Sequence, residues 1–115
     1  MLPAAFRMRA AADFAHTTRR GTKVTRGSVV VYLADSEGAG QPQVGLVVSK
    51  SVGNSVIRHR VSRRIRAAVS PLLPTLPAGT HVVVRALPGA ARDPSLARSI
   101  HDALAVGLAR RAAAP

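Results

Sequence analysis

The segment between Asn54 and Pro71 constrains the fold of this chain more than any other part of the sequence. Asn54 is a natural helix N-cap, and Pro71 cannot continue a helix, so the pattern predicts one helix over residues 55–70. One narrow face of that helix is purely apolar and needs a surface to cover it. The chain must therefore supply a sheet or another helix for this face, which consists of Ile57, Val61, Ile65 and Ala68.

The opposite face of the same helix is predicted to be a ladder of cations. Positive side chains recur about one helical turn apart, close enough to bind successive phosphates of a nucleic acid. A face that only meets water would usually mix charges of both signs, yet no acidic residue lies between Glu37 and Asp93. The ladder comprises Arg60, Arg63 and Arg66 with His59 among them, while Arg58 and Arg64 flank the apolar stripe.

The overall charge indicates a polyanionic partner. Seventeen Lys and Arg against five Asp and Glu give a net charge of +12 on 115 residues, and such a body repels itself until a polyanion neutralises it. Nucleic acid is favoured over a membrane surface, because no amphipathic stretch sets bulky aromatic residues opposite its charges. The longest apolar run, residues 29–34, is far too short to span a membrane. The chain has no cysteine, which is compatible with the cytoplasmic location that we expect.

Two further helices are predicted from periodicity and capping residues. A helix over residues 9–20 is followed by Gly21 as its C-cap. A last helix begins after Asp93 and Pro94. Its apolar stripe recurs at every fourth position and consists of Leu96, Ile100, Leu104 and Leu108.

Short runs of β-branched residues predict the sheet. Strands are expected over 28–34, 44–49 and 81–87, with a weaker one over 22–25 and a turn over 37–42. Together with the helices they predict one α+β domain over residues 1–115, a small sheet covered by helices. Residues 112–115 are expected to be a frayed tail.

The basic helix and the loop before it resemble a known protein family. Gly53-Asn54-x-Val56-x-Arg58-x-Arg60, continued by Arg63-Arg64-x-Arg66, is similar to the "RNR" signature of the bacterial ribonuclease P protein subunit. The resemblance covers nearly the whole chain. Further matches in order and spacing are Leu2-Pro3, Arg7, Arg9, Asp13-Phe14, Gly21, Tyr32, the segments 44–50 and 82–85, and Pro88. The family usually has Asn between the two arginines, where this chain has His59, so an amide contact at that position is not expected.

The resemblance implies a fold and a function. The fold is a four-stranded sheet packed with three helices in the order αβββαβα, similar to a ribosomal-protein domain, with a left-handed βαβ crossover through the basic helix. The function is that of a ribonucleoprotein subunit that binds ribonuclease P RNA and precursor tRNA and aids removal of the 5′ leader. The RNA, with Mg²⁺, performs the chemistry, and the protein alone is expected to bind no metal or cofactor.

The resemblance also implies two RNA-binding surfaces. Residues expected to face the catalytic RNA are Lys50, Gly53, Asn54, Arg58, His59, Arg60, Arg63, Arg64 and Arg66. A cleft between the first helix and the sheet is expected to hold the single-stranded leader, with Arg7, Arg9, Phe14, Thr18 and Tyr32 as candidate residues.

The residues themselves give the leader surface independent support. Phe14 and Tyr32 are the only aromatic residues in the predicted helices and strands, and bases stack on aromatic faces. Phe14 serves equally well as the apolar anchor of its helix, whereas the hydroxyl of Tyr32 favours a partly wet site. The family often has a second aromatic residue at the position of Thr18, so stacking is expected to be thinner here.

Three other classes of protein are less well supported. None of the four histidines (His16, His59, His81 and His101) is spaced from a carboxylate or another histidine as a metal site or an acid–base pair requires. A protein-based nuclease is therefore disfavoured, and we expect no catalytic residue. A ribosomal structural protein would share charge, size and fold but would lack the long signature. A DNA-binding helix would carry base-reading Asn or Gln beside its arginines, so no DNA partner is expected.

Overall fold

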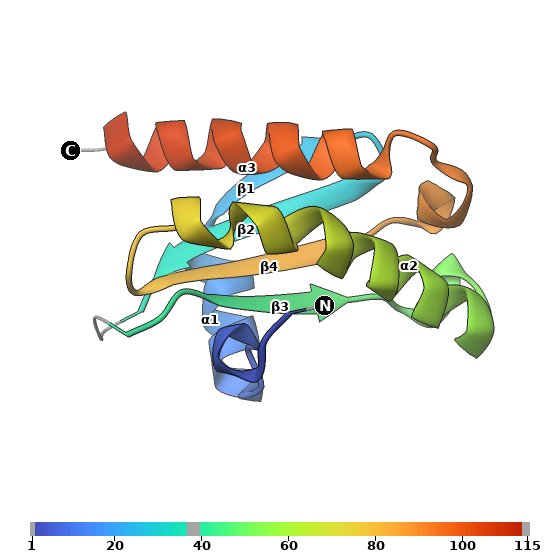
Figure 1. Cartoon of the computed structure of the whole chain (residues 1–115), viewed down its shortest axis with the longest axis horizontal. Coiled ribbons are helices and arrows are strands. Elements are labelled where there is room, and N and C mark those ends of the chain that lie inside the picture. The colour runs from blue at the N-terminus through green and yellow to red at the C-terminus, as the bar shows by residue number, and fades with distance from the viewer. Residues whose placement is uncertain (1, 37–39, 114–115) are drawn as a thin grey trace.

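A four-stranded sheet with helices on both faces forms the body of the protein (Figure 1). The structure is a computed structural model that describes residues 2–36 and 40–113. Its helices and strands are α1 (Ala11–Arg20), β1 (Thr22–Arg26), β2 (Val29–Asp35), β3 (Gln43–Val47), α2 (Ser55–Val69), β4 (Thr80–Ala86) and α3 (Leu96–Ala113). Short 3-10 turns occur at η1 (Ala4–Phe6), η2 (Lys50–Val52), η3 (Ser70–Thr75) and η4 (Pro88–Arg92). The α+β class and the order αβββαβα are confirmed, including the weakly predicted first strand.

The sheet has the strand order β1-β2-β4-β3. β1 and β2 form an antiparallel hairpin whose turn contains Gly27 at a φ of 50°, a backbone angle that favours glycine. β4 lies in the interior, antiparallel to β2 and parallel to β3. Three successive valines of β4 have no exposed surface, because helices cover both faces of this strand. They are Val82, Val83 and Val84.

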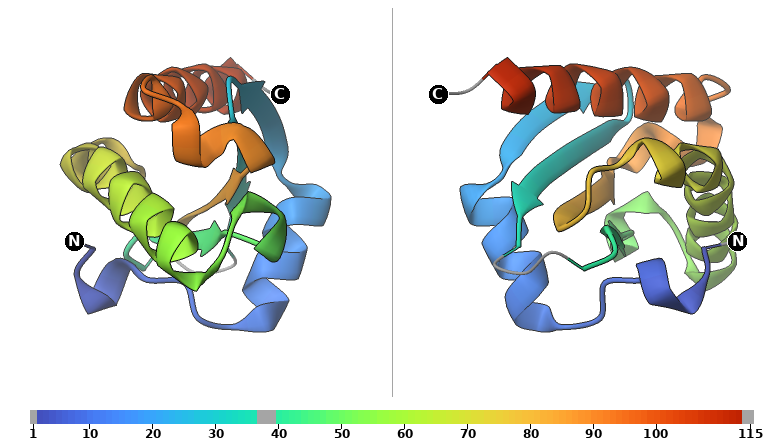
Figure 2. Two further views of the ribbon diagram at one scale, coloured as in Figure 1. Left: turned by 90° about the vertical axis from the view of Figure 1, so that its right-hand side faces the viewer. Right: turned by 60° about the vertical axis from the view of Figure 1, so that its left-hand side comes forward.

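The connection from β3 to β4 through α2 is left-handed. In Figure 1 both strands point to the right, β3 lies below β4, and α2 passes in front of the sheet. Figure 2 confirms that α2 lies on the opposite side of the sheet from α1. Almost all βαβ connections are right-handed, so this crossover, expected from the family resemblance, is a specific feature of the fold. It places the basic helix over the end of the sheet where β3 is the edge strand.

The two faces of the sheet carry separate apolar clusters. The larger cluster lies between the sheet and the helices α2 and α3, and contains residues such as Leu33, Val61, Ile65 and Leu104. The smaller one lies on the α1 side and contains Met8, Val30, Tyr32 and Val83, with Phe14, Val47 and Leu87 packed against it. The apolar stripes predicted for α2 and α3 therefore do face the core.

Gly21 ends α1 for a different reason from the one that its position suggests. As predicted, it is the C-cap, and its N–H donates to the carbonyl of Thr17 at 2.9 Å. Its φ of −76° and ψ of 161° are extended rather than left-handed. A Cβ at this position would collide with the carbonyl oxygens of Thr17 and Leu33. Gly21 is therefore required by the close approach of α1 to β2.

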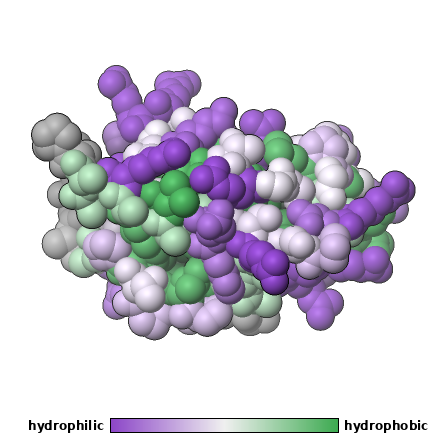
Figure 3. Space-filling model, turned by 90° about the horizontal axis from the view of Figure 1, so that it is seen from above, coloured by the Kyte–Doolittle hydropathy of each residue, from purple (hydrophilic) through white to green (hydrophobic). Residues whose placement is uncertain are grey.

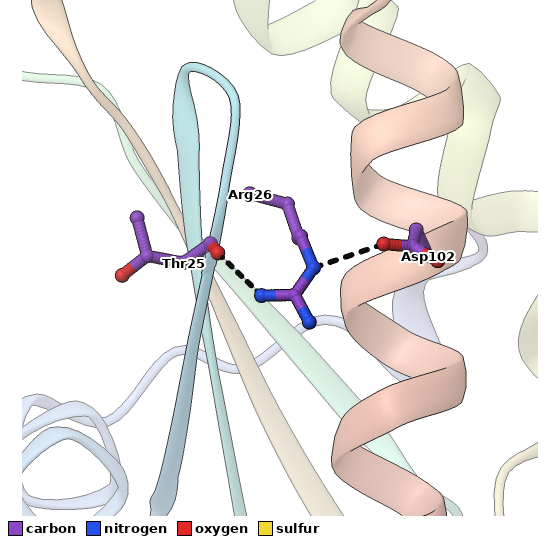
Figure 4. Close-up of polar contacts among 3 residues, drawn as sticks. All are labelled: Thr25, Arg26 and Asp102. Carbon is purple, nitrogen blue, oxygen red and sulfur yellow. Dashed lines mark hydrogen bonds and ion pairs between the residues drawn. The ribbon is translucent and has the colours of Figure 1, made fainter.

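Ion pairs fasten α3 across the sheet. Arg26 on β1 donates through Nε to Asp102 at 2.9 Å and through a terminal nitrogen to the Thr25 carbonyl at 2.8 Å (Figure 4). Near the other end of the helix, Arg111 pairs with Asp35 at 2.5 Å and donates to the Leu33 carbonyl at 3.1 Å. These contacts hold α3 over the β1–β2 hairpin at two points.

The boundaries of two predicted segments change. Asp93 does precede the last helix, but its Oδ1 accepts from the Ser95 N–H at 2.8 Å and closes a turn, so α3 begins only at Leu96. The helix extends to Ala113, so residues 112–113 of the expected tail are helical. The rest of that tail, and residues 37–39 of the predicted turn, lie outside the described residues.

Candidate nucleic-acid interface

The start of α2 is built as the sequence predicts. The Asn54 side chain accepts a hydrogen bond from the Ile57 N–H at 2.9 Å, which satisfies one of the donors that a helix N-terminus leaves free. Gly53 precedes the cap, and a Cβ there would approach Cγ2 of Ile57 to 2.7 Å. Lys50 lies exposed in the turn η2 just before. The loop from Lys50 to Asn54 therefore joins one exposed cation to a set of helix N–H groups.

The outer face of α2 is cationic along its length. His59, Arg60 and Arg63 are exposed, and Arg66 is half-buried. These side chains, with Arg64, Ala67 and Arg7 from the N-terminal segment, line a hollow of about 820 Å³. Arg7 thus extends the ladder beyond the helix, although the resemblance places it on the leader surface. The structure brings together residues that the sequence analysis assigns to two different surfaces.

No carboxylate neutralises the ladder within residues 2–36 and 40–113. The two ion pairs found there both involve α3, through Asp102 and Asp35. A third aspartate, Asp93, accepts from the Ser28 hydroxyl at 2.6 Å. That hydrogen bond, with others from the Ser95 and Ser28 backbone and the nearby Arg64, lowers the pKa of Asp93 below its usual value. These three aspartates therefore lie at the α3 side of the molecule, and none of them forms an ion pair with Arg60, Arg63 or Arg66.

Arg64 lines the hollow and also donates hydrogen bonds to backbone carbonyls. Its guanidinium donates to the carbonyl of Ala90 at 3.2 Å and to the carbonyl of Asp93. These bonds tie α2 to η4 and to the segment that leads into α3. The resemblance implies that Arg64 faces the catalytic RNA, but its terminal nitrogens are already engaged by the protein backbone.

Arg58 carries a buried hydrogen-bond donor that has no acceptor among the described residues. Its side chain is half-buried, and its Nε is buried without a hydrogen-bond partner in the part of the chain that the structure describes. A buried donor that lacks an acceptor costs about 1–3 kcal/mol. An acceptor supplied by a bound molecule would remove that cost.

Of the residues predicted for the leader surface, Phe14, Arg7 and Arg9 lie beside one small hollow. The ring of Phe14 lies on the backbone of Gly45, where a Cβ would approach the ring carbon Cζ to 2.5 Å. Phe14, Arg7, Arg9, Gly45 and Arg66 are among the residues that line a hollow of about 190 Å³. Phe14 is only half-buried, so it contributes to the small apolar cluster and still presents part of its ring to this hollow. Phe14 is thus an apolar anchor of α1 and also a partly accessible ring beside this hollow.

Two candidate leader residues do not present their side chains as expected. Only 7% of Tyr32 is exposed, and the residue belongs to the cluster on the α1 side of the sheet, so its ring is largely covered. The hydroxyl of Thr18 donates to the carbonyls of Phe14 at 3.0 Å and Ala15 at 3.2 Å, within its own helix. Neither residue lines the hollow beside Phe14.

Gly45 is a site residue that the sequence analysis missed. The signal was available, because a glycine inside a strand often marks a close approach by another group. The dual position of Arg66, which lines both hollows, could not be read from the sequence. It depends on how α2 crosses β3.

The described residues include no group of three or more His, Cys, Asp or Glu side chains that could hold a metal ion. His101 contacts the Ala68 carbonyl at 2.8 Å and joins α3 to α2, and His81 is buried in β4. No helix in this part of the chain is long and apolar enough to cross a membrane. Figure 3 shows hydrophilic side chains projecting around the outline of the molecule.

The fold and this surface define a class of small basic α+β domains in which a cationic helix crosses a sheet beside a small aromatic hollow. Comparisons with known proteins place the chain within that class. The family model for ribonuclease P matches residues 2–106. The chain belongs to the ribonuclease P protein family.

Individual relatives agree with this assignment. The "Ribonuclease P protein component" of Mycobacterium sp. (strain KMS) is 46% identical over 111 residues, covering 96% of this chain and 92% of the relative. That of Rhodococcus opacus (strain B4) is 47% identical over 116 residues, covering 96% and 91%. The structure of the Staphylococcus aureus RNase P protein has a TM-score of 0.81 at 26% identity, covering 89% of this chain and 94% of that chain. The Thermotoga maritima RNase P protein, at 20% identity and a TM-score of 0.69, shares the fold.

Proposed function

We propose that this protein binds the catalytic RNA of ribonuclease P through α2 and the single-stranded 5′ leader of precursor tRNA beside Phe14. It thereby aids endonucleolytic removal of the leader in the cytoplasm. The observation that carries the proposal is the continuity of the two surfaces. Arg7 and Arg66 line both the hollow along the ladder and the hollow beside Phe14, so one cationic surface can contact both RNAs at once.

Each surface suits a different form of RNA. Arginines spaced along a helix contact phosphates and make no demand on base sequence, which fits a structured RNA recognised by its backbone. A half-buried aromatic ring beside Arg7 and Arg9 offers a base a flat face and its phosphates a counter-charge, which fits a single strand.

The protein's contribution is electrostatic and positional. Two RNAs that meet at a cleavage site repel each other, and a body of net charge +12 reduces that repulsion. Holding the leader in place fixes where the precursor lies relative to the catalytic RNA, and such positioning lowers the barrier to reaction. We assign the bond cleavage to the RNA with its Mg²⁺, and no proton transfer to a protein side chain.

The experiment that tests the proposal is recovery of the protein from its host without nuclease, followed by sequencing of the RNA that accompanies it. We expect ribonuclease P RNA to be the enriched species. A double variant, Arg60→Ala with Arg63→Ala, serves as the matched control, because it removes two exposed cations and leaves the core intact. Enrichment of ribosomal RNA instead, or equal recovery of RNA with the control, would contradict the proposal.

A further inference from the structure

The two edges of the sheet differ in how they are covered. β3 forms one edge, and the N-terminal segment closes it, because Arg7 pairs with Val44 in a parallel bridge and the Met8 N–H donates to the Val44 carbonyl at 3.0 Å. β1 forms the other edge, and among residues 2–36 and 40–113 it pairs with β2 alone. The outer side of β1 is therefore a place where a further strand could add to the sheet.

Two residues of β1 direct their backbone groups toward this outer side. Arg26 and Val29 face each other across the two-residue turn of the β1–β2 hairpin. Such a pair exchanges hydrogen bonds, and bonded and non-bonded pairs then alternate along the two strands. Lys23 and Thr25 fall in the non-bonded pairs, so their N–H and C=O groups point away from β2. Both residues are exposed.

The Arg26 side chain covers part of this edge. Its guanidinium donates to the Thr25 carbonyl at 2.8 Å and to Asp102 on α3 at 2.9 Å (Figure 4). Val24 belongs to the larger apolar cluster, so Arg26, two residues later, leaves the strand on the same α3 side. The guanidinium thus binds an acceptor that an added strand would need, and it holds a positive charge beside the edge.

Without this contact the edge would fit a second copy of the chain. Two β1 strands related by a two-fold axis at Val24 run antiparallel, and Lys23 of each copy then lies opposite Thr25 of the other. The outward N–H and C=O groups of these residues would satisfy one another. Because the two lysines do not face each other directly, this pairing avoids the cost of opposed like charges. The side chains of the strand alone therefore do not prevent it.

We propose that Arg26 keeps the β1 edge closed to pairing with a second copy of this chain, and that Asp102 holds the guanidinium in place. The net charge of +12 also keeps copies apart, but salt or a bound polyanion reduces that repulsion. The bond from Arg26 to the Thr25 carbonyl does not depend on net charge, so it protects the edge when the repulsion is gone. The inference is independent of the proposed function, because it involves neither α2 nor the hollow beside Phe14.

The test is analytical ultracentrifugation of the full-length protein, freed of RNA, from about 0.1 M to about 1 M salt, where the Debye length falls from about 10 Å to about 3 Å. Arg26→Ala should self-associate on the order of tenfold more tightly than the unaltered chain, and increasingly so as salt rises. The matched control is Arg98→Ala, which removes an exposed arginine of α3 and gives the same net charge. It should remain monomeric, as the unaltered chain does.

Two further measurements locate the contact. In the associated Arg26→Ala variant, amide hydrogen exchange should slow at Lys23 and Thr25. Adding Thr25→Pro to Arg26→Ala should restore the monomer, because proline has no N–H and is tolerated in edge strands where that group faces solvent. Thermal unfolding checks that each variant is folded. If Arg26→Ala unfolds, Asp102→Asn provides the test, because it frees the guanidinium from α3 and should also increase self-association.

Three results would overturn the inference. The first is an Arg26→Ala variant, or in its place Asp102→Asn, that stays as monomeric as Arg98→Ala over the whole salt series. The second is association that persists with Thr25→Pro or leaves exchange at Lys23 and Thr25 unchanged, because the copies would then meet elsewhere. The third is association of the unaltered chain that protects these same amides, because the edge would then be open with Arg26 in place.

Discussion

At the scale of single residues, spacing alone does not separate a cation that meets RNA from one that holds the fold. Arg63 and Arg64 are adjacent in the sequence and both belong to the family-like motif. Arg63 is exposed, whereas Arg64 donates to backbone carbonyls that lie 26 and 29 residues away. The helical wheel correctly places Arg64 at the border of the apolar stripe. Its partners, however, depend on where η4 lies in the folded chain.

Single substitutions should separate the two arginines. Arg64→Ala should lower the free energy of unfolding by about 1.5–3 kcal/mol, because two bonds from a charged donor are lost. Arg63→Ala should leave unfolding nearly unchanged and reduce the log–log salt slope of RNA binding by about one unit. Denaturant titration and binding at several salt concentrations measure the two quantities. If Arg63→Ala lowered the free energy of unfolding and Arg64→Ala lowered the salt slope, the assignment of Arg63 to the RNA-binding face would be wrong.

Asn54 should have two measurable effects. Replacing it by alanine removes the cap bond to Ile57 and should cost about 1 kcal/mol of stability. If the loop also contacts RNA, affinity at saturating folded protein should fall as well. Asn54→Ser provides the control, because serine caps a helix about as well as asparagine does. Full affinity in both folded variants would leave Asn54 as a cap alone.

At the scale of elements, the packing of α1 on the sheet determines the shape of the leader surface. The sequence predicts α1 and the strands within a few residues, because their apolar patterns are local. It does not predict that Tyr32 is buried or that Phe14 packs on Gly45. Both facts follow from the position of α1 over β2 and β4. The ion pairs of Arg26 and Arg111 could not be predicted for the same reason, since each arginine lies 76 positions from its partner in the sequence.

Gly45→Ala should alter the leader surface without changing any charge. The added methyl group would collide with the Phe14 ring, so the ring must move or α1 must lift from β3. We expect weaker binding of precursor tRNA with a leader and unchanged binding of ribonuclease P RNA. Gly89→Ala is the matched control, because a Cβ there meets no atom within 4 Å. An unchanged preference for leader-bearing substrate would contradict the role given to Phe14.

The junction between the β1–β2 hairpin and α3 should be sensitive to acid. The pKa of Asp93 is lowered, first of all by the hydrogen bond from Ser28, so its ionised form stabilises the folded state. That stabilisation is complete above the unfolded pKa of about 3.9 and is lost as the pH falls through the lower folded value. Ser28→Ala should therefore destabilise the protein more at about pH 7 than at about pH 3, which lies below the unfolded pKa. Urea unfolding at both pH values measures this, and an equal difference at both would exclude the Asp93 bond as its cause.

At the scale of the whole molecule, charge is distributed by face. Of the four aspartates that the structure describes, Asp35, Asp93 and Asp102 contact the hairpin or α3, and Asp13 lies in the first turn of α1. The surface of α2 therefore keeps its positive charge. The sequence predicts the net charge and the sign of the helix face. It could not predict which arginines the acids would neutralise, because that depends on the tertiary fold.

This distribution predicts how the protein and Mg²⁺ substitute for each other. Mg²⁺ screens the repulsion between two RNAs, as the protein does, so added protein should accelerate cleavage most when Mg²⁺ is scarce. The gain should be largest for precursors that have a leader. Cleavage assays over a Mg²⁺ series, with and without protein, measure this, and the Arg60→Ala, Arg63→Ala variant is the control. Cleavage by the protein without its RNA would contradict the assignment of the chemistry.

The interior position of β4 also determines the order in which the chain can fold during synthesis. β2 and β3 are both made before β4. Until residues 80–86 have left the ribosome, β2 keeps one edge unpaired and β3 has no strand partner. The basic helix is likewise complete before the strand that follows it. At bacterial translation rates this interval is on the order of seconds. During that time the nascent chain exposes apolar strand edges, which favour association with other chains, beside a finished set of arginines able to bind whatever RNA is nearby.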